Sequence, residues 1–527
     1  MSYGAKSDLA NMVGIQSSES QSQRVETRLI EPRSFSQSQC TFELPQEGIL
    51  SDDIALQLQL TTAQNAAAQR NELPLMAGVL GCLDRVEMFF GTTLINAVEN
   101  APHLLQMKNC LVDQDVRDQT HNVYLGSFSG LKTVNATNTA IPPAPQPGKF
   151  ALNSIDTVTD FNTRASTGVI GLTQTDALQT NREEWFRTTA AADTTPFWCI
   201  KLKDIFPVLS QIPLPLFALK ERIRFVFHFS QDLAGNRAVG TDVAAGQALP
   251  AGTPFAVGNT ILQSSCKLST DLIYYEDQVG MPSPMVRIQQ ELEKGVSLVM
   301  TDYVNVFSTM PAVPAPAVNT RQSQSLSMLL GLDHQIVRNL LVATAPLPDY
   351  SVVPTLPANR LLGNYLSKAS NYQTTLQVSV NNENIFPSAL NTTSKLYNEF
   401  SQVEDRPLKV NRGAYSADGQ IGINTTTNLT DQYGEDTNQT AFPTALFMGG
   451  VPQSELNWSL QYLGVNLSKD ATQNYVGNGI QVGRQPVILT LDRQRTAEDF
   501  AAIRVLVWAE VERMMLIKSG NIFMSGQ

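Results

Sequence analysis

The chain has 527 residues, of which 42% are hydrophobic, enough to bury a large core and to exclude global disorder. Its 37 Lys and Arg stand against 48 Asp and Glu, a net charge of −11, which disfavours a general nucleic-acid-binding protein because phosphate contacts need clustered basic residues. Only 16% of the residues are charged, against roughly 25% in ordinary soluble domains. A polar but uncharged surface of this kind suits a protein that packs against copies of itself, because every buried charge would need a partner.

No targeting or membrane-spanning segment is expected from the sequence. Residues 1–23 contain no apolar segment typical of a secretory signal, and Ser2 stands where N-myristoylation needs a glycine. Charged residues interrupt the apolar stretch 501–517, which is too polar to cross a bilayer. The cysteines are scattered and never spaced as CxxC, which predicts buried thiols in a protein that folds in a reducing compartment and is not secreted; they are Cys40, Cys82, Cys110, Cys199 and Cys266.

Short segments with alternating or dense apolar residues recur along the chain and predict strands. In chain order they cover residues 54–60, 85–90, 200–203, 222–229, 376–380, 458–463 and 503–508. Helical patterns are confined to residues 101–112, 357–367 and 393–400. Asp418-Gly419 and Asn478-Gly479 accept the positive φ of a hairpin turn. The chain is therefore predicted to be mostly β, with long loops of small residues over 133–149, 234–259, 311–318 and 413–440.

One arrangement of elements occurs twice. Residues 83–110 predict a strand, a tight turn at Gly91-Thr92, a short strand and a helix. Residues 372–400 predict the same order, with the polar turn at residues 381–384. Side-chain identity between the two segments is poor, but the lengths of the elements agree. Two related β domains in tandem explain the repeat, and the boundary is predicted near Met281-Pro-Ser-Pro284, where two prolines mark a linker.

Three segments carry a resemblance to a known family. Residues 199–230 have a strand, a short helix, an apolar Pro-Leu step and a long apolar strand; residues 86–110 have a strand, a turn at a glycine, a short strand and a helix. Residues 505–520 (VLVWAEVERMMLIKSG) form an apolar strand with a short polar end. In this order they resemble the double jelly-roll major capsid proteins of double-stranded DNA viruses, in the branch of virophages, Polinton-like viruses and large algal viruses.

The resemblance implies an all-β fold of two tandem eight-stranded jelly rolls with long inter-strand loops and a few short helices. The domains expected are a flexible N-terminal arm over residues 1–34, a first roll over 35–280 and a second roll over 281–527. It further implies a structural protein and not an enzyme. Three chains would form a homotrimeric, pseudo-hexagonal capsomer that tiles the icosahedral shell of the virion.

Expected partners of such a protein are further copies of itself, a single jelly-roll penton protein and minor or cement capsid proteins. Direct nucleic-acid binding is not expected, and an internal membrane is a candidate neighbour. No cofactor, catalytic residue or metal ligand is predicted. The histidines are far apart and none lies in a metal-binding spacing; they are His103, His121, His228 and His334. We expect His103 to cap a helix or face solvent, and His228 to be a structural residue of a strand.

The alternative is a large β-sandwich that binds carbohydrate or cleaves it as a glycoside hydrolase does. Cleavage needs two carboxylates facing each other at about 5–10 Å. Adjacent residues of a strand point to opposite faces, so Asp52-Asp53 and Glu183-Glu184 cannot form that pair by themselves. The remaining acidic pairs are Glu291/Glu293 and Glu404-Asp405, and the tryptophans available for a sugar platform are Trp185, Trp198, Trp458 and Trp508. Trp198 and Trp508 lie in apolar strands, and we predict that Trp508 belongs to the core of the second roll.

Overall fold

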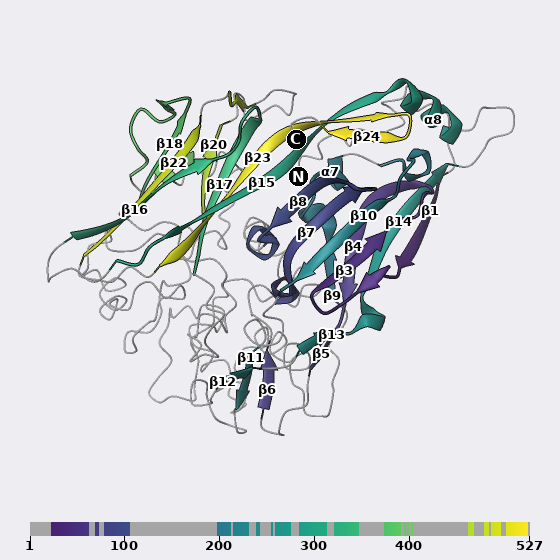
Figure 1. Ribbon diagram of the computed structural model, residues 1–527, viewed down its shortest axis with the longest axis horizontal. Helices are drawn as coiled ribbons and strands as arrows, with labels where there is room; N and C mark the ends of the chain where they lie inside the picture. Colours follow the sequence, from purple (N-terminus) through teal and green to yellow (C-terminus); the bar gives the residue numbers. More distant parts are fainter. Residues whose placement is uncertain are drawn as a thin grey trace, which may run out of the picture.

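The architecture was taken from a computed structural model of the chain, which is built almost entirely of antiparallel strands (Figure 1). The structure describes residues 23–62, 69–72, 78–105, 198–211, 214–230, 239–242, 254–256, 259–275, 284–313, 321–346, 374–391, 395–396, 398–399, 403, 462–467, 479–483, 486–496 and 502–524.

The first half folds into two sheets that pack face to face. One sheet has the strand order β1-β14-β4-β9 and the other has β2-β3-β10-β7-β8. Their bounds are β1 Gln23–Ile30, β2 Ser34–Phe35, β3 Gln39–Glu43, β4 Ile49–Leu58, β7 Leu83–Phe90, β8 Thr93–Glu99, β9 Trp198–Lys201, β10 Ile223–Phe229 and β14 Lys267–Tyr275. Smaller sheets join β5 (Leu60–Thr62) to β13 (Asn259–Ile261) and β6 (Gln69–Glu72) to β11 (Val239–Asp242) and β12 (Pro254–Ala256).

The second half repeats this arrangement. Its two sheets have the orders β15-β23-β17-β20 and β16-β22-β18-β19. The bounds are β15 Val296–Met310, β16 Arg321–Leu330, β17 Ile336–Pro346, β18 Thr374–Val380, β19 Glu383–Asn384, β20 Tyr462–Asn466, β22 Val487–Thr496 and β23 Ile503–Lys518. Two short strands extend the first of these sheets: β21 (Ile480–Gln481) pairs with β17 and β24 (Asn521–Met524) pairs with β23.

The strand orders of the two halves are the same. When the principal strands of each half are numbered along the chain, omitting β2, β21, β24 and the small sheets, both halves have one sheet in the order 1-8-3-6 and one in the order 2-7-4-5. Such interleaving of two sheets, with the first and last strands side by side, is the Greek-key arrangement of a jelly roll. The predicted all-β double jelly roll is therefore confirmed.

Apolar alternation explains why these segments form strands with one buried face. In β10, Ile223, Phe225, Phe227 and Phe229 are buried, whereas Arg224 between them is half-buried. The ring of Phe227 packs edge-on against Phe42 of the neighbouring strand β3, with 5.8 Å between the ring centres. Aromatic pairs of this geometry add to the free energy gained by burying their surface.

The repeat seen in the sequence corresponds to the fourth and fifth strands of each roll. In the first roll, β7 and β8 are joined by a turn at Gly91, whose φ is +56°. In the second, β18 and β19 are joined at Asn381 and Asn382, with φ values of +54° and +63°. Glycine and asparagine tolerate this left-handed backbone, which a tight hairpin requires. Helical residues 101–105 follow β8 as predicted, and the described residues of the predicted helix 393–400, which are 395–396 and 398–399, are also helical. Residues 106–112 and the predicted helix at 357–367 lie outside the described residues.

Strand β1 corrects the predicted extent of the N-terminal arm. It lies within residues 1–34, yet it pairs with β14 over its whole length, from Gln23 opposite Tyr275 to Ile30 opposite Leu268. Polar and charged residues make up most of this strand, so its sequence does not predict a strand, and its backbone pairing with β14 places it in the sheet. The predicted boundary at residue 281 falls between the end of β14 and the helix α8 (Pro284–Lys294), and it stays a prediction.

Candidate functional site: the interface between the two rolls

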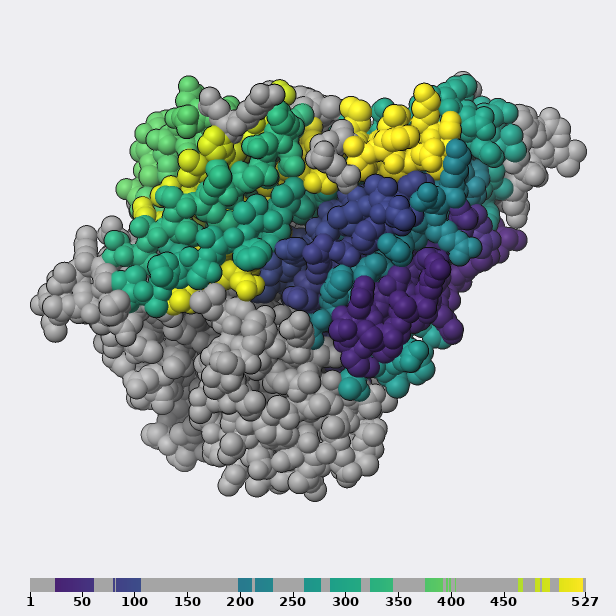
Figure 2. Space-filling view, viewed as in Figure 1, coloured from purple at the N-terminus to yellow at the C-terminus, as the bar shows by residue number. Residues whose placement is uncertain are grey.

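The two longest strands among the described residues connect the rolls. β15 and β23 pair over 15 residues, from Val296 opposite Ile517 to Met310 opposite Ile503. One end of β23 pairs with β17 inside the second roll, and the other end pairs with β24 and contacts α8. Figures 1 and 2 show this far end, in yellow, lying across the first roll. The second roll therefore contributes strands that reach over its neighbour.

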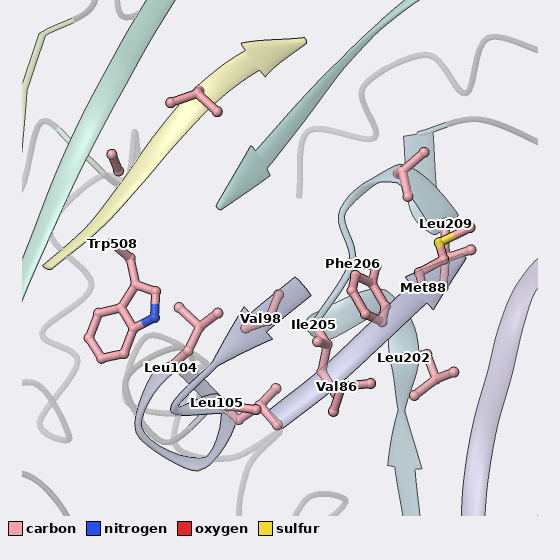
Figure 3. Packing of buried hydrophobic residues seen from close by; sticks show 14 of the residues in the cluster. Val86, Met88, Val98, Leu104, Leu105, Leu202, Ile205, Phe206, Leu209 and Trp508 are labelled. Atoms are coloured by element: carbon pink, nitrogen blue, oxygen red, sulfur yellow. The ribbon is translucent and has the colours of Figure 1, made fainter. Parts of the chain in front are cut away.

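Trp508 is buried between the rolls and not in the core of the second roll. The odd-numbered residues of β23 from Ile503 to Val511 are all buried, which marks the face toward the roll's own core. Leu506 and Trp508 are even-numbered and lie on the opposite face of the strand, yet both are 0% exposed. Figure 3 shows the indole of Trp508 beside Leu104 of the first roll. The prediction that Trp508 is buried is confirmed, and its assignment to the core is wrong.

Polar side chains join the rolls at the rim of this apolar contact. The amide Nδ2 of Asn100, which follows β8, donates to Oδ1 of Asn305 in β15 at 3.0 Å. Arg504 of β23 donates from Nη1 to Oδ1 of the same Asn100 at 3.3 Å. Four residues before Asn100, Asn96 of β8 donates to Asp302 of β15. The edge strand β8 of one roll thus lies against the edge strand β15 of the other.

Asp302 carries the most buried charge at this interface. Asp302 is 1% exposed, and its Oδ2 lies 2.8 Å from Nη1 of Arg513. Burial raises the pKa of the Asp302 carboxyl to about 6, while the Arg513 charge and the hydrogen bond from the backbone N–H of Tyr303 oppose that rise. The interface therefore contains a carboxyl whose pKa is raised to about 6.

The turn between β23 and β24 seats the second roll on the first. Lys220 N donates to Gly520 O at 2.9 Å, and Ser519 N donates to Leu292 O of α8 at 3.1 Å. Gly520 has a φ of +76°, and a Cβ there would lie 2.8 Å from the carbonyl oxygen of Ala218. Only glycine fits this close approach of two backbones.

None of the histidines in the described ranges belongs to a reactive cluster. Nε2 of His228 lies 3.2 Å from Oε2 of Glu87 on the neighbouring strand, in agreement with the structural role predicted for it. His103 is 9% exposed, so the expectation that it faces solvent is wrong. His334 lies in a turn with a φ of +61°, and His121 lies outside the described residues. Within those residues, no group of three or more His, Cys, Asp and Glu could hold a metal ion.

Three of the acidic residues considered for a hydrolase have cationic partners. Asp52 lies 3.8 Å from the ammonium of Lys203, and Asp53 lies 4.0 Å from that of Lys201. Glu291 pairs with Lys294 at 2.6 Å in the last turn of α8. Glu183-Glu184, Glu404-Asp405, Trp185 and Trp458 lie outside the described residues.

The cysteines in the described ranges are free thiols. Cys40, Cys82 and Cys266 are buried, as predicted, and Cys199 is half-buried. Sγ of Cys266 lies 3.9 Å from Sγ of Cys40, and burial raises the pKa of the Cys40 thiol.

Among the described residues, no helix is both long enough and apolar enough to span a membrane.

The fold is similar to that of viral capsid structures. A chain of the Sputnik virophage cryo-EM structure matches with a TM-score of 0.53 and 12% identity, over 95% of this chain and 88% of that one. The PBCV-1 virus capsid matches with a TM-score of 0.48 and 12% identity, over 96% and 97%. The mavirus major capsid protein matches with a TM-score of 0.46 and 9% identity, over 95% and 90%.

By sequence, no protein-family model and no curated protein matches the chain. At sequence identities this low, the similarity concerns the backbone fold, and no functional residue can be transferred from one protein to the other. The two halves share one strand order, as a double jelly roll requires. The Sputnik chain matches nearly the whole length of this chain, and it therefore indicates the same two-roll fold. The chain is a double jelly-roll protein whose fold is similar to that of a chain of the Sputnik virophage structure.

Proposed function

We propose that this protein is a structural, non-enzymatic major capsid protein of a double-stranded DNA virus. The observation that carries the proposal is the pair of jelly rolls with one strand order, docked through the β8–β15 interface. A shell subunit needs a rigid body with repeated edges and no reaction centre. The similarity of its fold to the Sputnik virophage chain supports the same role.

The assembly we propose is a homotrimeric, pseudo-hexagonal capsomer. Three chains with two rolls each supply six similar bodies, enough to close a six-sided ring. Neighbouring capsomers, a penton protein and minor or cement proteins would complete the shell of the virion. An internal membrane is a candidate neighbour of its inner face.

The purified protein is expected to be a stable homotrimer. The reason is its low content of charged residues, 16%, together with edges that a single chain leaves open. Native mass spectrometry should give about three times the 57.7 kDa chain mass. A clean monomer at micromolar concentration would contradict the capsomer proposal.

The trimer is expected not to bind duplex DNA directly. The net charge of −11 repels phosphate, and several basic residues already pair with acids, such as Lys203 with Asp52 at 3.8 Å and Arg222 with Glu43 at 3.7 Å. An anisotropy titration at about 0.15 M salt should show no saturable binding tighter than roughly 10⁻⁴–10⁻⁶ M, the range of non-specific binders. Tighter binding that weakens steeply with added salt would reveal a basic surface and disprove this expectation.

A further inference from the structure

Two of the buried cysteines lie next to each other in the core of the first roll. Cys40 belongs to β3, and Cys266 directly precedes β14. Sγ of Cys266 lies 3.9 Å from Sγ of Cys40, although the two residues are 226 positions apart in the chain. Because β3 and β14 belong to different sheets of the roll, the two thiols meet between the packed sheets.

The backbones that carry the two thiols are held in place by regular hydrogen bonding. Cys40 stands opposite Phe227 in the pairing of β3 with β10. The backbone N–H of Cys266 donates to the carbonyl oxygens of Leu262 and Gln263, each at 3.2 Å. The short distance between the sulfur atoms therefore follows from the packing of the two sheets.

The side chain of Gln37 ties the segment before one cysteine to the segment before the other. Its Nε2 donates to the carbonyl oxygen of Ile261 at 2.9 Å, and its Oε1 accepts from the backbone N–H of Ile261 at 2.8 Å. Gln37 lies three residues before Cys40, and Ile261 lies five residues before Cys266. This two-way contact fixes the positions of the two cysteines relative to each other.

The distance between the two sulfur atoms is suited to the formation of a bond. An S–S bond is about 2.0 Å long, so the two atoms have to approach each other by about 1.9 Å. A change of rotamer about one Cα–Cβ bond moves a sulfur atom by more than this and leaves the backbone in place. The sheets can therefore keep their packing while the bond forms.

We propose that Cys40 and Cys266 are a latent disulfide site, which a peroxide converts into a covalent link between the two sheets of the first roll. The inference goes beyond the proposed function and does not depend on it. It assigns a modification to two residues that the shell-forming role leaves unused.

The reaction balances with hydrogen peroxide as the oxidant. Sγ of one cysteine attacks a peroxide oxygen, the O–O bond breaks, and a sulfenic acid and one water molecule form. Sγ of the other cysteine attacks the sulfenic sulfur, so that the S–S bond forms, the S–O bond breaks and a second water molecule leaves. The two thiols lose two hydrogens and two electrons, and one peroxide is reduced to two water molecules.

Burial is expected to make the pair react slowly in the closed roll. Both cysteines are 0% exposed, and burial raises the pKa of the Cys40 thiol, which keeps it in the less reactive protonated form. The residues just before each cysteine are exposed, however: they are 36–39 before Cys40 and Gln263 and Ser264 before Cys266. Local opening of these two surface turns would admit peroxide while the rest of the roll stays folded.

The disulfide is expected to stabilise the first roll. It would close a loop between positions 226 residues apart, and a link restricts the unfolded chain more as the loop becomes longer. The midpoint of urea unfolding of the oxidised protein should therefore shift upward, by on the order of 1 M. Treatment with a reducing agent should reverse the shift.

The test is oxidation of the purified full-length protein with hydrogen peroxide. Catalase then removes the peroxide, and N-ethylmaleimide in denaturant blocks the remaining thiols. Mass spectrometry of proteolytic peptides should find Cys40 and Cys266 in one linked pair of peptides that separates on reduction. In a non-reducing gel the oxidised chain should migrate faster, because the closed loop keeps the denatured chain more compact.

Matched variants identify the cysteines responsible. Cys40→Ser should abolish both the linked peptides and the faster migration. The control is Cys199→Ser, at a half-buried cysteine of β9, and it should leave both unchanged. The mass spectrum of the oxidised wild type gives an answer even if Cys40→Ser is insoluble.

Gln37→Ala tests the route by which peroxide reaches the pair. Loss of the two hydrogen bonds to Ile261 should favour local opening and speed the formation of the disulfide by about tenfold, with the same product. A variant that oxidises at the wild-type rate would overturn this route.

Two other results would overturn the inference itself. The first is a fully oxidised wild type in which Cys40 and Cys266 are still alkylated as thiols or carry separate sulfinic acids. The second is a link between these residues that lowers the urea midpoint, because the bond would then distort the roll instead of stabilising it. Either result would leave the proposed shell-forming function untouched.

Discussion

Replacing Trp508 by Ala is expected to lower the free energy of unfolding by about 3–5 kcal/mol, the usual cost of removing a buried tryptophan. The residue is 0% exposed and lies at the contact of the rolls, beside Leu104. The cavity would therefore open between two bodies that each keep their own core. Chemical denaturation of the purified variant measures the loss of unfolding free energy. We also expect poor assembly, because the two rolls would no longer be held in one fixed orientation.

The control is Trp508→Phe, which keeps a ring in the site. Nε1 of Trp508 has no hydrogen-bond partner among the described residues, so its loss breaks no hydrogen bond. The Phe variant should lose clearly less stability than the Ala variant. A Trp508→Ala protein with unchanged unfolding free energy would show that the ring is peripheral.

A double-mutant cycle can separate the interface from a core position. Trp508→Ala and Leu104→Ala should show a coupling energy of about 0.5–3 kcal/mol, as expected for residues in contact. Val86 lies farther from Trp508 in Figure 3, within the first roll, and Val86→Ala should be nearly additive with Trp508→Ala. Equal coupling in both cycles would contradict the placement of Trp508 at the interface.

The second large effect is a pH dependence of stability that Asp302→Asn should remove. The pKa of Asp302 rises from 3.8 to about 6 on folding, mainly because the carboxyl is buried. Because the folded state binds the proton more tightly, this group makes the protein more stable as the pH falls from above 6 toward 4. A rise of about two units in the pKa corresponds to about 3 kcal/mol of unfolding free energy over that pH range.

Paired denaturation curves between pH 4 and 8 test this. The stability of the wild type relative to Asp302→Asn should increase as the pH falls, whatever constant cost the variant suffers from leaving Arg513 without its anion. Asn305→Ala, a change in the same interface that removes no titrating group, should differ from the wild type by an amount independent of pH. A difference between wild type and Asp302→Asn that does not vary with pH would contradict a raised pKa for Asp302.

Much of the fold could be predicted from local patterns. The turn at Gly91 and the one at Asn381-Asn382 are visible because tight hairpins need residues that accept positive φ, and the strands around them alternate with a period of two. The duplicated order of strand, turn and short strand follows from these short-range preferences. The all-β class, the repeat and the family resemblance were therefore accessible without coordinates.

The candidate site was not accessible in the same way. The apolar sequence around Trp508 predicts that this residue is buried, but it does not tell whether its own roll or the first roll covers it. The core of a roll and the contact between two rolls both need large apolar side chains. Polar and charged residues dominate strand β1, and its pairing with β14 joins segments of the chain more than two hundred residues apart, from Gln23 opposite Tyr275 to Ile30 opposite Leu268. The raised pKa of Asp302 comes from its burial between elements that are far apart in the chain, such as β8, whose Asn96 donates to it, and β15.

The β class, the two related halves and the scarcity of charge follow from composition or from residues close together in the chain, and so does the burial of Cys40, Cys82 and Cys266. The three-dimensional fold was needed to show which edges meet, with β8 against β15, and that Asp302 is enclosed between the rolls. Edge contacts and desolvation arise from residues separated by two hundred positions or more, as Asn96 and Asp302 are, and no short-range pattern encodes such a separation.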